Sequence, residues 1–321
     1  MNTSTVHRWA AGRGMASRIV GLGALALAQD RLGRLADEGS LDPGFVQGWL
    51  SGFTYLRGLS VAAPRSLVLL AVPRPAHLVS FDLDEGPLEL VIPPTYVAYR
   101  PTFVRVRDEM RRDLGLAPDE LDVVSAPLRS LAAASGLVRY GRNNLGYVDG
   151  LGSYVQLVAL VTSFELEPDG ELRPIEERGM DLCRKCTLCL KACLPGAIGR
   201  DRFLLRAERC FTRFSESAEP IPDTMPSPSS DCLIGCLKCQ EVCPVNRGRL
   251  KKEPSGLAFV GEEARAFAAE PERRDPEAWG RAAAKIATLG TTEKGERFAR
   301  NLRLILERRR QGRTSRTGER Q

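Results

Sequence analysis

Hydrophobic positions along the first 60 residues recur with the period of a helix. Leu22, Leu25, Leu32 and Leu35 lie at helical spacing in a stretch rich in Ala, Leu, Gly and Arg. This pattern predicts a helical segment over residues 1–60.

Three later apolar runs are short enough to be strands. Ser66–Val72 is continuous and bounded by prolines, and Leu88–Ile92 contains β-branched residues. Both have the composition of buried strands. Tyr154–Glu165 predicts a further strand of the same kind.

Two helical patterns and a glycine-rich segment separate these runs. Tyr96–Leu116 is amphipathic and Pro127–Leu137 is rich in alanine, so both predict helices laid on a sheet. Gly141–Ser153 contains four glycines and predicts a loop at the sheet edge. Its glycines could bring backbone N–H groups close to a ligand or form a tight hairpin turn, and no phosphate-loop spacing decides between them.

The net charge of +6 lies at the end of the chain. Residues 300–321 contain eight arginines against Glu307 and Glu319, so this tail carries +6 and the rest of the chain is formally neutral. A charged tail of this kind predicts disorder over residues 311–321. A basic nucleic-acid cleft in the body of the protein is not indicated.

The cysteines and the apolar runs bear on the compartment. All nine cysteines fall between Cys183 and Cys243, which excludes a disulfide framework spread along a secreted chain. The apolar run Ile19–Ala28 follows Arg18 but lacks a twin arginine and continues into a helical pattern. No stretch approaches the roughly 20 apolar residues of a membrane helix. We expect a cytoplasmic protein with no membrane partner.

The first cysteine motif has the spacing C-x2-C-x2-C-x3-C. It comprises Cys183, Cys186, Cys189 and Cys193, with Pro195 shortly after. This is the spacing of bacterial ferredoxins, in which three cysteines bind one 4Fe-4S cube and the fourth binds a neighbouring cube. One such motif therefore predicts a second.

The second motif lacks its first ligand. Cys236, Cys239 and Cys243 precede Pro244, and the missing cysteine is either Cys210 or Cys232. A pair of four-cysteine zinc sites is the alternative, but zinc sites usually lack a third cysteine only three residues on. With exchange of the fourth ligands, one cluster takes Cys183, Cys186, Cys189 and Cys243, and the other takes Cys193, Cys236, Cys239 and one of Cys210 and Cys232.

Five segments of the chain resemble the epoxyqueuosine reductases, which are cobalamin-dependent iron-sulfur reductases related to reductive dehalogenases. The Gly235–Asn246 segment, G-C-L-K-C-Q-E-V-C-P-V-N, carries the most specific match. The other matching segments are Val124–Pro127, Gly141–Asn144, Gly152–Tyr154, and Arg209–Arg213 followed by Ile221–Pro222.

The resemblance implies a ligand choice, a second cofactor and a division of the chain. It selects Cys210 over Cys232, and it implies a base-off corrinoid next to one cluster, in a pocket lined by Arg142, Asn143, Gly152 and Ser153. The expected fold is α+β. Its parts are a helical segment (1–60), an α/β domain for corrinoid and substrate (61–170), a ferredoxin-like domain with two 4Fe-4S clusters (171–255), C-terminal helices (256–310) and the basic tail (311–321).

The sequence departs from the family at three places. Val124 stands where the family has an acidic proton donor, the family's Tyr-His pair is not evident, and its C-terminal helical-repeat domain is replaced by short helices and the arginine tail. The last departure counts against a tRNA partner. The substitutes considered for the donor are Asp149, Asp122 and Tyr147, with Tyr140, Tyr154 and Glu241 behind them.

Two functional hypotheses follow. In the first, two 4Fe-4S clusters deliver electrons from a low-potential donor of the ferredoxin or flavodoxin type to a corrinoid that reduces an unidentified small-molecule or nucleoside substrate. In the second, the chain is a non-catalytic electron-transfer protein serving a partner reductase. Neither His7 nor His77 belongs to a motif, and we expect both to be ordinary surface or cap residues.

Overall fold

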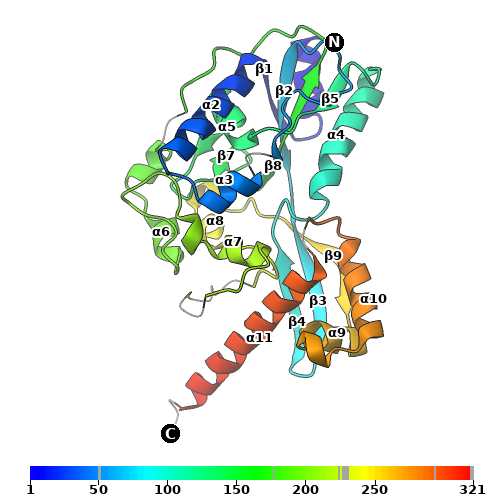
Figure 1. Ribbon diagram of the computed structural model, residues 1–321, viewed down its shortest axis with the longest axis vertical. Helices are drawn as coiled ribbons and strands as arrows, with labels where there is room; N and C mark the ends of the chain where they lie inside the picture. Colours follow the sequence, from blue (N-terminus) through cyan, green and yellow to red (C-terminus); the bar gives the residue numbers. More distant parts are fainter. Residues whose placement is uncertain (50–51, 176–177, 223–224, 226–230, 293, 319–321) are drawn as a thin grey trace.

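The computed structural model describes residues 1–321 apart from 50–51, 176–177, 223–224, 226–230, 293 and 319–321. Figure 1 shows two lobes along the long axis, with the cysteine-bearing segment on one flank where they meet. The upper lobe holds a four-stranded sheet and the lower lobe a three-stranded sheet. The N-terminus lies at the top of the upper lobe and the last helix points away from the lower lobe.

The upper sheet is antiparallel throughout, with the strand order β1-β2-β8-β5. Val68 in the middle of β2 pairs with Ile19 on one side and with Leu160 on the other. The predicted strands at Ser66–Val72 and Tyr154–Glu165 are thereby confirmed. The strands span Ala16–Gly21 (β1), Ser66–Pro73 (β2), Leu121–Val123 (β5) and Val155–Thr162 (β8).

Helices cover both faces of this sheet, which explains why β2 is apolar at successive positions. Val68, Leu70 and Val72 share one core with α1 (Thr3–Ala11) and α4 (Tyr99–Leu114). Residues on the other face of β2 share a second core with α2 (Gly23–Asp37) and α5 (Leu128–Ala134). The two helices predicted to lie on a sheet are α4 and α5, so that prediction is confirmed.

The prediction of a helical segment over residues 1–60 is only partly correct. Strand β1 interrupts it, and α3 (Pro43–Trp49) follows α2. The sequence of β1, A-S-R-I-V-G, lacks the strict alternation of apolar and polar residues that marks a strand. Its neighbours Ile19 and Val20 are both buried, one toward each core. A boundary at residue 60, as predicted, would therefore separate β1 from the other strands of its sheet.

The lower lobe joins segments that are distant in sequence. Strand β3 (Ala76–Leu83) pairs with β4 (Gly86–Ile92) in a hairpin and runs parallel to β9 (Lys252–Phe259). Phe81 and Phe259 stack with ring centroids 5.0 Å apart. Helices α9 (Gly261–Ala268), α10 (Pro276–Ala287) and α11 (Gly295–Gly318) pack on this sheet. The strand predicted at Leu88–Ile92 is confirmed, while the predicted C-terminal helical part shares its core with two strands of the predicted α/β domain.

The end of the chain differs from the expected disordered tail over residues 311–321. Helix α11 extends to Gly318. Residues 319–321 lie outside the described part of the chain. Among the described residues, no helix has both the length and the apolar character needed to cross a membrane.

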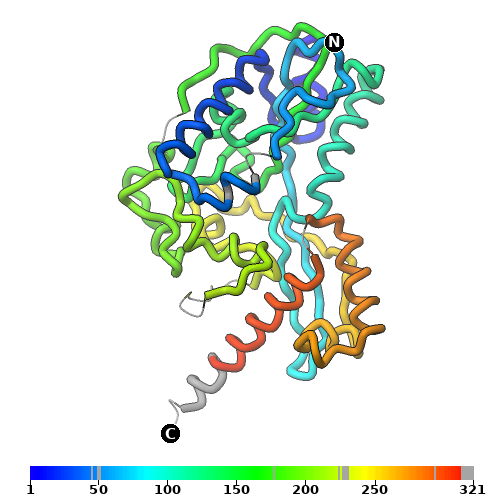
Figure 2. Tube along the Cα trace, in the orientation of Figure 1, coloured from blue at the N-terminus to red at the C-terminus, as the bar shows by residue number. Residues whose placement is uncertain are grey.

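The cysteine segment consists of short helical turns joined by loops, which Figure 2 follows along the flank of the molecule. A two-stranded hairpin from the upper lobe, β6 and β7, lies against it. Within the cysteine segment, residues 223–224 and 226–230 lie outside the described part of the chain. The elements are Arg139–Tyr140 (β6), Gly146–Tyr147 (β7), Asp181–Arg184 (η2), Leu188–Ala192 (α6), Ala207–Arg209 (η3), Phe211–Glu216 (α7), Lys238–Glu241 (α8) and Pro244–Asn246 (η4).

Candidate iron-sulfur site

The structure divides eight of the cysteines into two sets of four. Set one lines a single small cavity beneath the β6–β7 hairpin. Burial and the negative charge of its other three thiols raise the pKa of Cys189 to about 11. Set one comprises Cys183, Cys186, Cys189 and Cys243.

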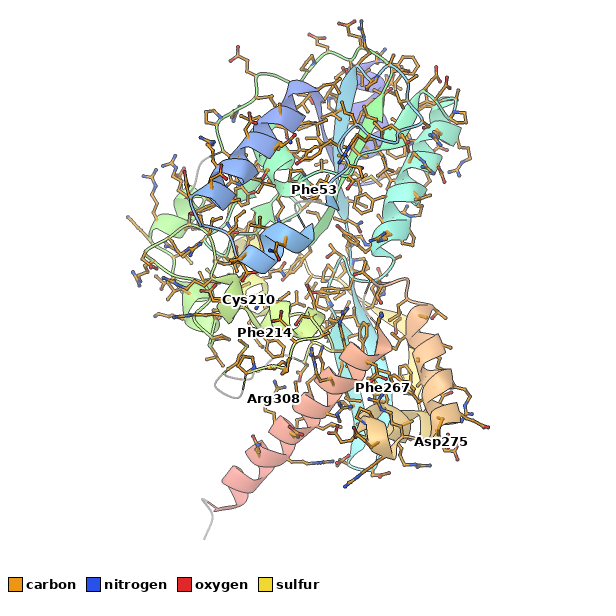
Figure 3. All side chains as sticks on the ribbon, in the orientation of Figure 1. Phe53, Cys210, Phe214, Phe267, Asp275 and Arg308 are labelled. Carbon is orange, nitrogen blue, oxygen red and sulfur yellow. The ribbon has the colours of Figure 1, made fainter. Side chains whose placement is uncertain are left out.

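Set two gathers around Cys239, the most deeply placed of these thiols. Burial and the charges of Cys236, Cys210 and then Cys193 raise the pKa of Cys239 well above its usual range. Burial also raises the pKa of Cys236, to about 11, and Cys210 and Cys193 add to that rise. In Figure 3, Cys210 lies at the start of α7, close to Phe214. Set two comprises Cys193, Cys210, Cys236 and Cys239.

Cys232 has a different environment. Its side chain is 5% exposed and packs in an apolar cluster with Ala76, Val91 and Leu237. Its backbone forms an isolated bridge to Val91, at the end of β4. Cys232 therefore contributes to the junction between the cysteine segment and the lower lobe.

Each set has the four thiols that one 4Fe-4S cube binds. Among the described residues, no three His, Cys, Asp or Glu side chains gather tightly enough to hold one metal ion. A 4Fe-4S cube binds each thiolate at a different iron and so spreads its ligands farther apart. Burial raises the pKa of Cys189 in set one and of Cys239 in set two, so a cationic group is needed to hold these thiols deprotonated beside their neighbours.

The β6–β7 hairpin of the upper lobe contacts the cysteine segment beside both sets. Arg142 donates to the backbone carbonyl of Cys183, beside set one. Asn143 is buried, and its Nδ2 lies 3.3 Å from the carbonyl oxygen of Cys239, beside set two. The glycine-rich segment therefore contains a tight hairpin, as one of its two interpretations predicted, and its polar side chains contact the cysteine segment.

Tyr147 brings a hydroxyl to set one. Its ring is 3% exposed, and its oxygen accepts a hydrogen bond of 2.9 Å from Asn143 Nδ2. Burial, followed by a hydrogen bond to Cys243 Sγ, raises the pKa of Tyr147 far above its usual value. The hydroxyl thus stays protonated and donates to a thiolate of set one.

A buried amide joins the end of the same loop to the second cysteine motif. Asn246 Oδ1 accepts from the backbone N–H of Ser153 at 2.9 Å, and Nδ2 donates to Ser153 Oγ and to the Gln240 carbonyl. Gly152 has φ +72°, and a Cβ there would lie 2.5 Å from Asn246 Oδ1. Gly152 and Ser153 therefore lie in the contact between the upper lobe and the cysteine segment.

The acids considered as proton donors are placed unfavourably for that role. Burial works to raise the pKa of Asp122, but hydrogen bonds from Ser60, Val123 and Arg107 outweigh it and hold this carboxyl ionised. Asp149 is exposed and ion-paired with Arg139 on the outer side of the hairpin. Asp122 is therefore not a ready acid at neutral pH.

Val124 itself is 1% exposed and packs in the core of the upper lobe. The next residue, Ser125, forms an isolated bridge with Tyr55, whose φ of +52° is unusual for a residue with a side chain. Burial raises the pKa of Tyr55, so its hydroxyl stays protonated at neutral pH. Sequence analysis missed Tyr55, because only the fold brings it beside Ser125.

The histidines make local structural contacts. His7 lies 2.7 Å from both Ser17 Oγ and Asp169 Oδ1 through its two ring nitrogens. His77 is on β3 and pairs with Ile92 in the lower sheet. Both histidines are partly buried inside a helix or a strand, so neither is the surface or cap residue that was predicted.

Comparison with known proteins identifies the cysteine segment and finds relatives for part of the chain. Residues 182–246 match the family described as a 4Fe-4S double cluster binding domain. Epoxyqueuosine reductase of Bacillus subtilis (strain 168) is 35% identical over 121 residues, which are 38% of this chain and 29% of that protein. Epoxyqueuosine reductase of Cyclobacterium marinum is 30% identical over 200 residues, which are 61% of this chain and 60% of that protein. The matched part thus spans less than two thirds of either relative.

Solved structures share the fold over a longer stretch. The structure of epoxyqueuosine reductase from Bacillus subtilis superimposes with a TM-score of 0.62 at 19% identity, over 93% of this chain and 79% of that chain. A second epoxyqueuosine reductase, solved with an epoxyqueuosine-modified tRNA stem loop, gives 0.57 at 21% identity over 77% and 65% of the two chains. The chain is therefore epoxyqueuosine reductase-like in sequence and fold, and it carries a double 4Fe-4S cluster domain.

Proposed function

We propose that this chain is an iron-sulfur reductase whose two clusters are bound by set one and set two and pass single electrons to a reaction site on the upper lobe. The observation that carries the proposal is the division of eight cysteines into two sets of four, both lying beside one hairpin of the upper lobe. A plain ferredoxin needs little more than the cysteine segment to hold its clusters, so the upper lobe requires a further role.

A corrinoid is the second cofactor that the proposal includes. Of the four residues predicted to contact it, Asn143, Gly152 and Ser153 are engaged in the joint with the cysteine segment. Arg142 Nε, by contrast, is buried and finds no hydrogen-bond partner in the described part of the chain. Arg142 is therefore the residue that fits such a group by offering it an unsatisfied donor. When bound, a corrinoid supplies low-potential single-electron chemistry.

For the substrate we propose epoxyqueuosine carried in tRNA. The relatives are named for this substrate, and one of the solved neighbours was bound to a modified tRNA stem loop. The prediction against tRNA depended on the short C-terminal part and the neutral body. Helix α11 carries part of the basic tail, but Arg300, Arg309 and Arg310 on it already contact other parts of the chain, so the proposal of a tRNA substrate rests on the relatives.

Tyr55 is our proposed proton donor in place of the residue that Val124 replaces. It lies beside Ser125 in the segment that resembles the family's donor element, and its raised pKa keeps its proton available. Its positive φ is the kind of backbone strain that is retained where a side chain must be held in position.

A single-turnover assay tests this function. Reconstituted protein, reduced chemically, should convert an epoxyqueuosine-modified anticodon stem loop to the queuosine form. Tyr55→Phe should lower the rate by about 100-fold, the smaller end of the usual contribution of a general acid. Tyr99→Phe, on α4, is the matched control, since burial also raises the pKa of Tyr99, and it should retain the wild-type rate. Full activity of the Tyr55 variant would reject Tyr55 as the donor, and no conversion by the wild type would reject the substrate.

Tyr147→Phe should lower the reduction potential of the set-one cluster. In the wild type, the hydrogen bond from Tyr147 to Cys243 Sγ stabilises the reduced cluster, which is more negative than the oxidised one, and the variant loses this bond. If this stabilisation is about 1 kcal/mol, the potential falls by about 40 mV for one electron. An EPR-monitored redox titration measures the change. Tyr154→Phe is the control, because burial and neighbouring negative charges, rather than a thiol hydrogen bond, raise the Tyr154 pKa.

The electron-transfer hypothesis keeps one observation in its favour. A buried valine replaces the acid of the family at position 124, and a carrier needs no proton donor. Retention of cobalt by the purified protein separates the two hypotheses, since a carrier has no use for a corrinoid.

A further inference from the structure

Three leucines in the cysteine segment are exposed together. Leu182, Leu188 and Leu194 are 51%, 45% and 57% exposed. Among the described residues, six large hydrophobic side chains are exposed, and these three are the ones that lie close together in the sequence. We call them the leucine patch. Apolar side chains grouped at a surface indicate a contact with another molecule.

Two leucines of the patch lie beside set one. Leu182 and Leu188 line the same cavity as the four thiols of that set. Leu194 follows Cys193, which belongs to set two. A molecule docked on the patch would therefore be separated from the first cluster by little more than the leucine side chains.

Basic residues accompany the patch in the sequence, and we call them the basic rim: Arg178, Arg184, Lys185, Lys191, Arg200 and Arg202. Residues 178–202 include six basic residues and two acidic ones, a formal charge of +4. Both acids are ion-paired, Asp181 with Arg184 at 3.1 Å and Asp201 with Arg206 at 2.5 Å. Four of these basic residues line a concavity of about 220 Å³ beside Cys183 of set one: Arg178, Arg184, Arg200 and Arg202.

We propose that the leucine patch and its basic rim form the electron-entry surface for an acidic low-potential redox protein. The inference rests on the proposed function, which requires a donor. An apolar centre beside the cluster brings the two cofactors close, and the positive rim attracts and orients a negatively charged partner. Each encounter removes one electron from the reduced donor and reduces the set-one cube by one electron, with no bond made or broken.

The positions of the basic residues favour a protein partner over RNA. The positive side chains lie in the same segment as an exposed apolar centre, whereas an RNA backbone is bound by charge and polar contacts without such a centre. Stacking aromatic side chains, which bind single-stranded bases, are not among the exposed apolar residues of the described chain.

The test is stopped-flow reduction of the anaerobic holoprotein by a reduced flavodoxin with an acidic surface. Lys185→Glu combined with Lys191→Glu reverses two exposed charges of the rim. The second-order rate should fall about tenfold or more at low salt, and the wild-type rate should fall as salt is added. Reduction by photoexcited deazaflavin, a small neutral donor, should be unchanged in the double variant.

A matched control carries the same charge change elsewhere. Arg8→Glu combined with Arg265→Glu alters exposed residues on α1 and α9, away from the patch, and should leave the flavodoxin rate unchanged. Leu194→Ser should slow flavodoxin alone without loss of iron. The proposal is overturned if the rim and control variants slow equally, or if the rim variant instead loses stem-loop binding or cobalt. Because the measured quantity is cluster reduction, it stays informative even if epoxyqueuosine proves not to be the substrate.

Discussion

Cys210→Ala should reduce the iron content of the reconstituted protein from about eight to about four atoms per chain. The structure places this thiol with Cys193, Cys236 and Cys239, so its loss leaves one cube with three ligands. Metal-binding free energy is also folding free energy in such domains, and the variant should unfold at a lower temperature. Iron analysis and the thermal transition of anaerobically prepared protein measure both effects.

Cys232→Ala is the matched control for that experiment. Cys232 is buried among apolar residues at the junction with the lower lobe, where alanine removes one sulfur atom and leaves a small cavity. We expect about eight iron atoms and a modest loss of stability, on the order of 1 kcal/mol. The reverse outcome, with iron lost from the Cys232 variant and kept by the Cys210 variant, would exchange the two residues in our assignment.

Gly152→Ala should loosen the joint between the upper lobe and the cysteine segment. A left-handed backbone costs alanine about 1–2 kcal/mol, and the new Cβ would also lie 2.5 Å from Asn246 Oδ1. Displacing Asn246, which is 3% exposed, breaks its hydrogen bonds to Ser153 and leaves buried polar groups unpaired, at a further cost of about 1–3 kcal/mol. The melting temperature of the holoprotein and the rate of iron loss to a chelator report the change.

Gly150→Ala separates the two contributions. Gly150 has φ +79°, close to that of Gly152, but a Cβ there meets nothing within 4 Å. It should show the backbone cost alone and keep its iron as the wild type does. Equal effects of the two substitutions would mean that the contact with Asn246 does not hold the upper lobe to the cysteine segment.

The sequence predicted the chemistry of the site better than its surroundings. Cysteine spacing is a local property, so Cys183, Cys186 and Cys189 identified a cluster without any structure. Spacing could not choose between Cys210 and Cys232, because both lie outside the regular motif. The fold distinguishes the two residues. Cys210 is the N-cap of α7 and belongs to set two, whereas the backbone of Cys232 forms a bridge to Val91 in β4.

The lobes were the harder part to predict. Strand β3 has polar residues between its buried positions and pairs with β9, whose partner residues include Phe259 opposite Phe81. No local pattern reveals a pairing over so long a stretch of chain, and so the C-terminal helices were expected to form a separate part. Strand β1 was missed because it has only six residues and because its composition resembles the helical sequence on both sides.

The contacts of the glycine-rich segment also depend on tertiary structure. The sequence left open whether it binds a ligand or forms a turn. The structure has both a hairpin and a set of polar contacts, in which Arg142, Asn143 and Ser153 hold the cysteine segment. Tyr147 was considered as a proton donor, but its hydroxyl is directed to Cys243, where it affects a cluster instead.

The most direct test of the account is to count iron and cobalt in protein reconstituted anaerobically with iron, sulfide and hydroxocobalamin, and to record its EPR spectrum after reduction. The account predicts about eight iron atoms and one cobalt per chain, with signals of two reduced 4Fe-4S clusters and of base-off cob(II)alamin. About eight iron atoms without retained cobalt would contradict the corrinoid and leave an electron-transfer protein. Two zinc ions in place of iron would contradict the account altogether.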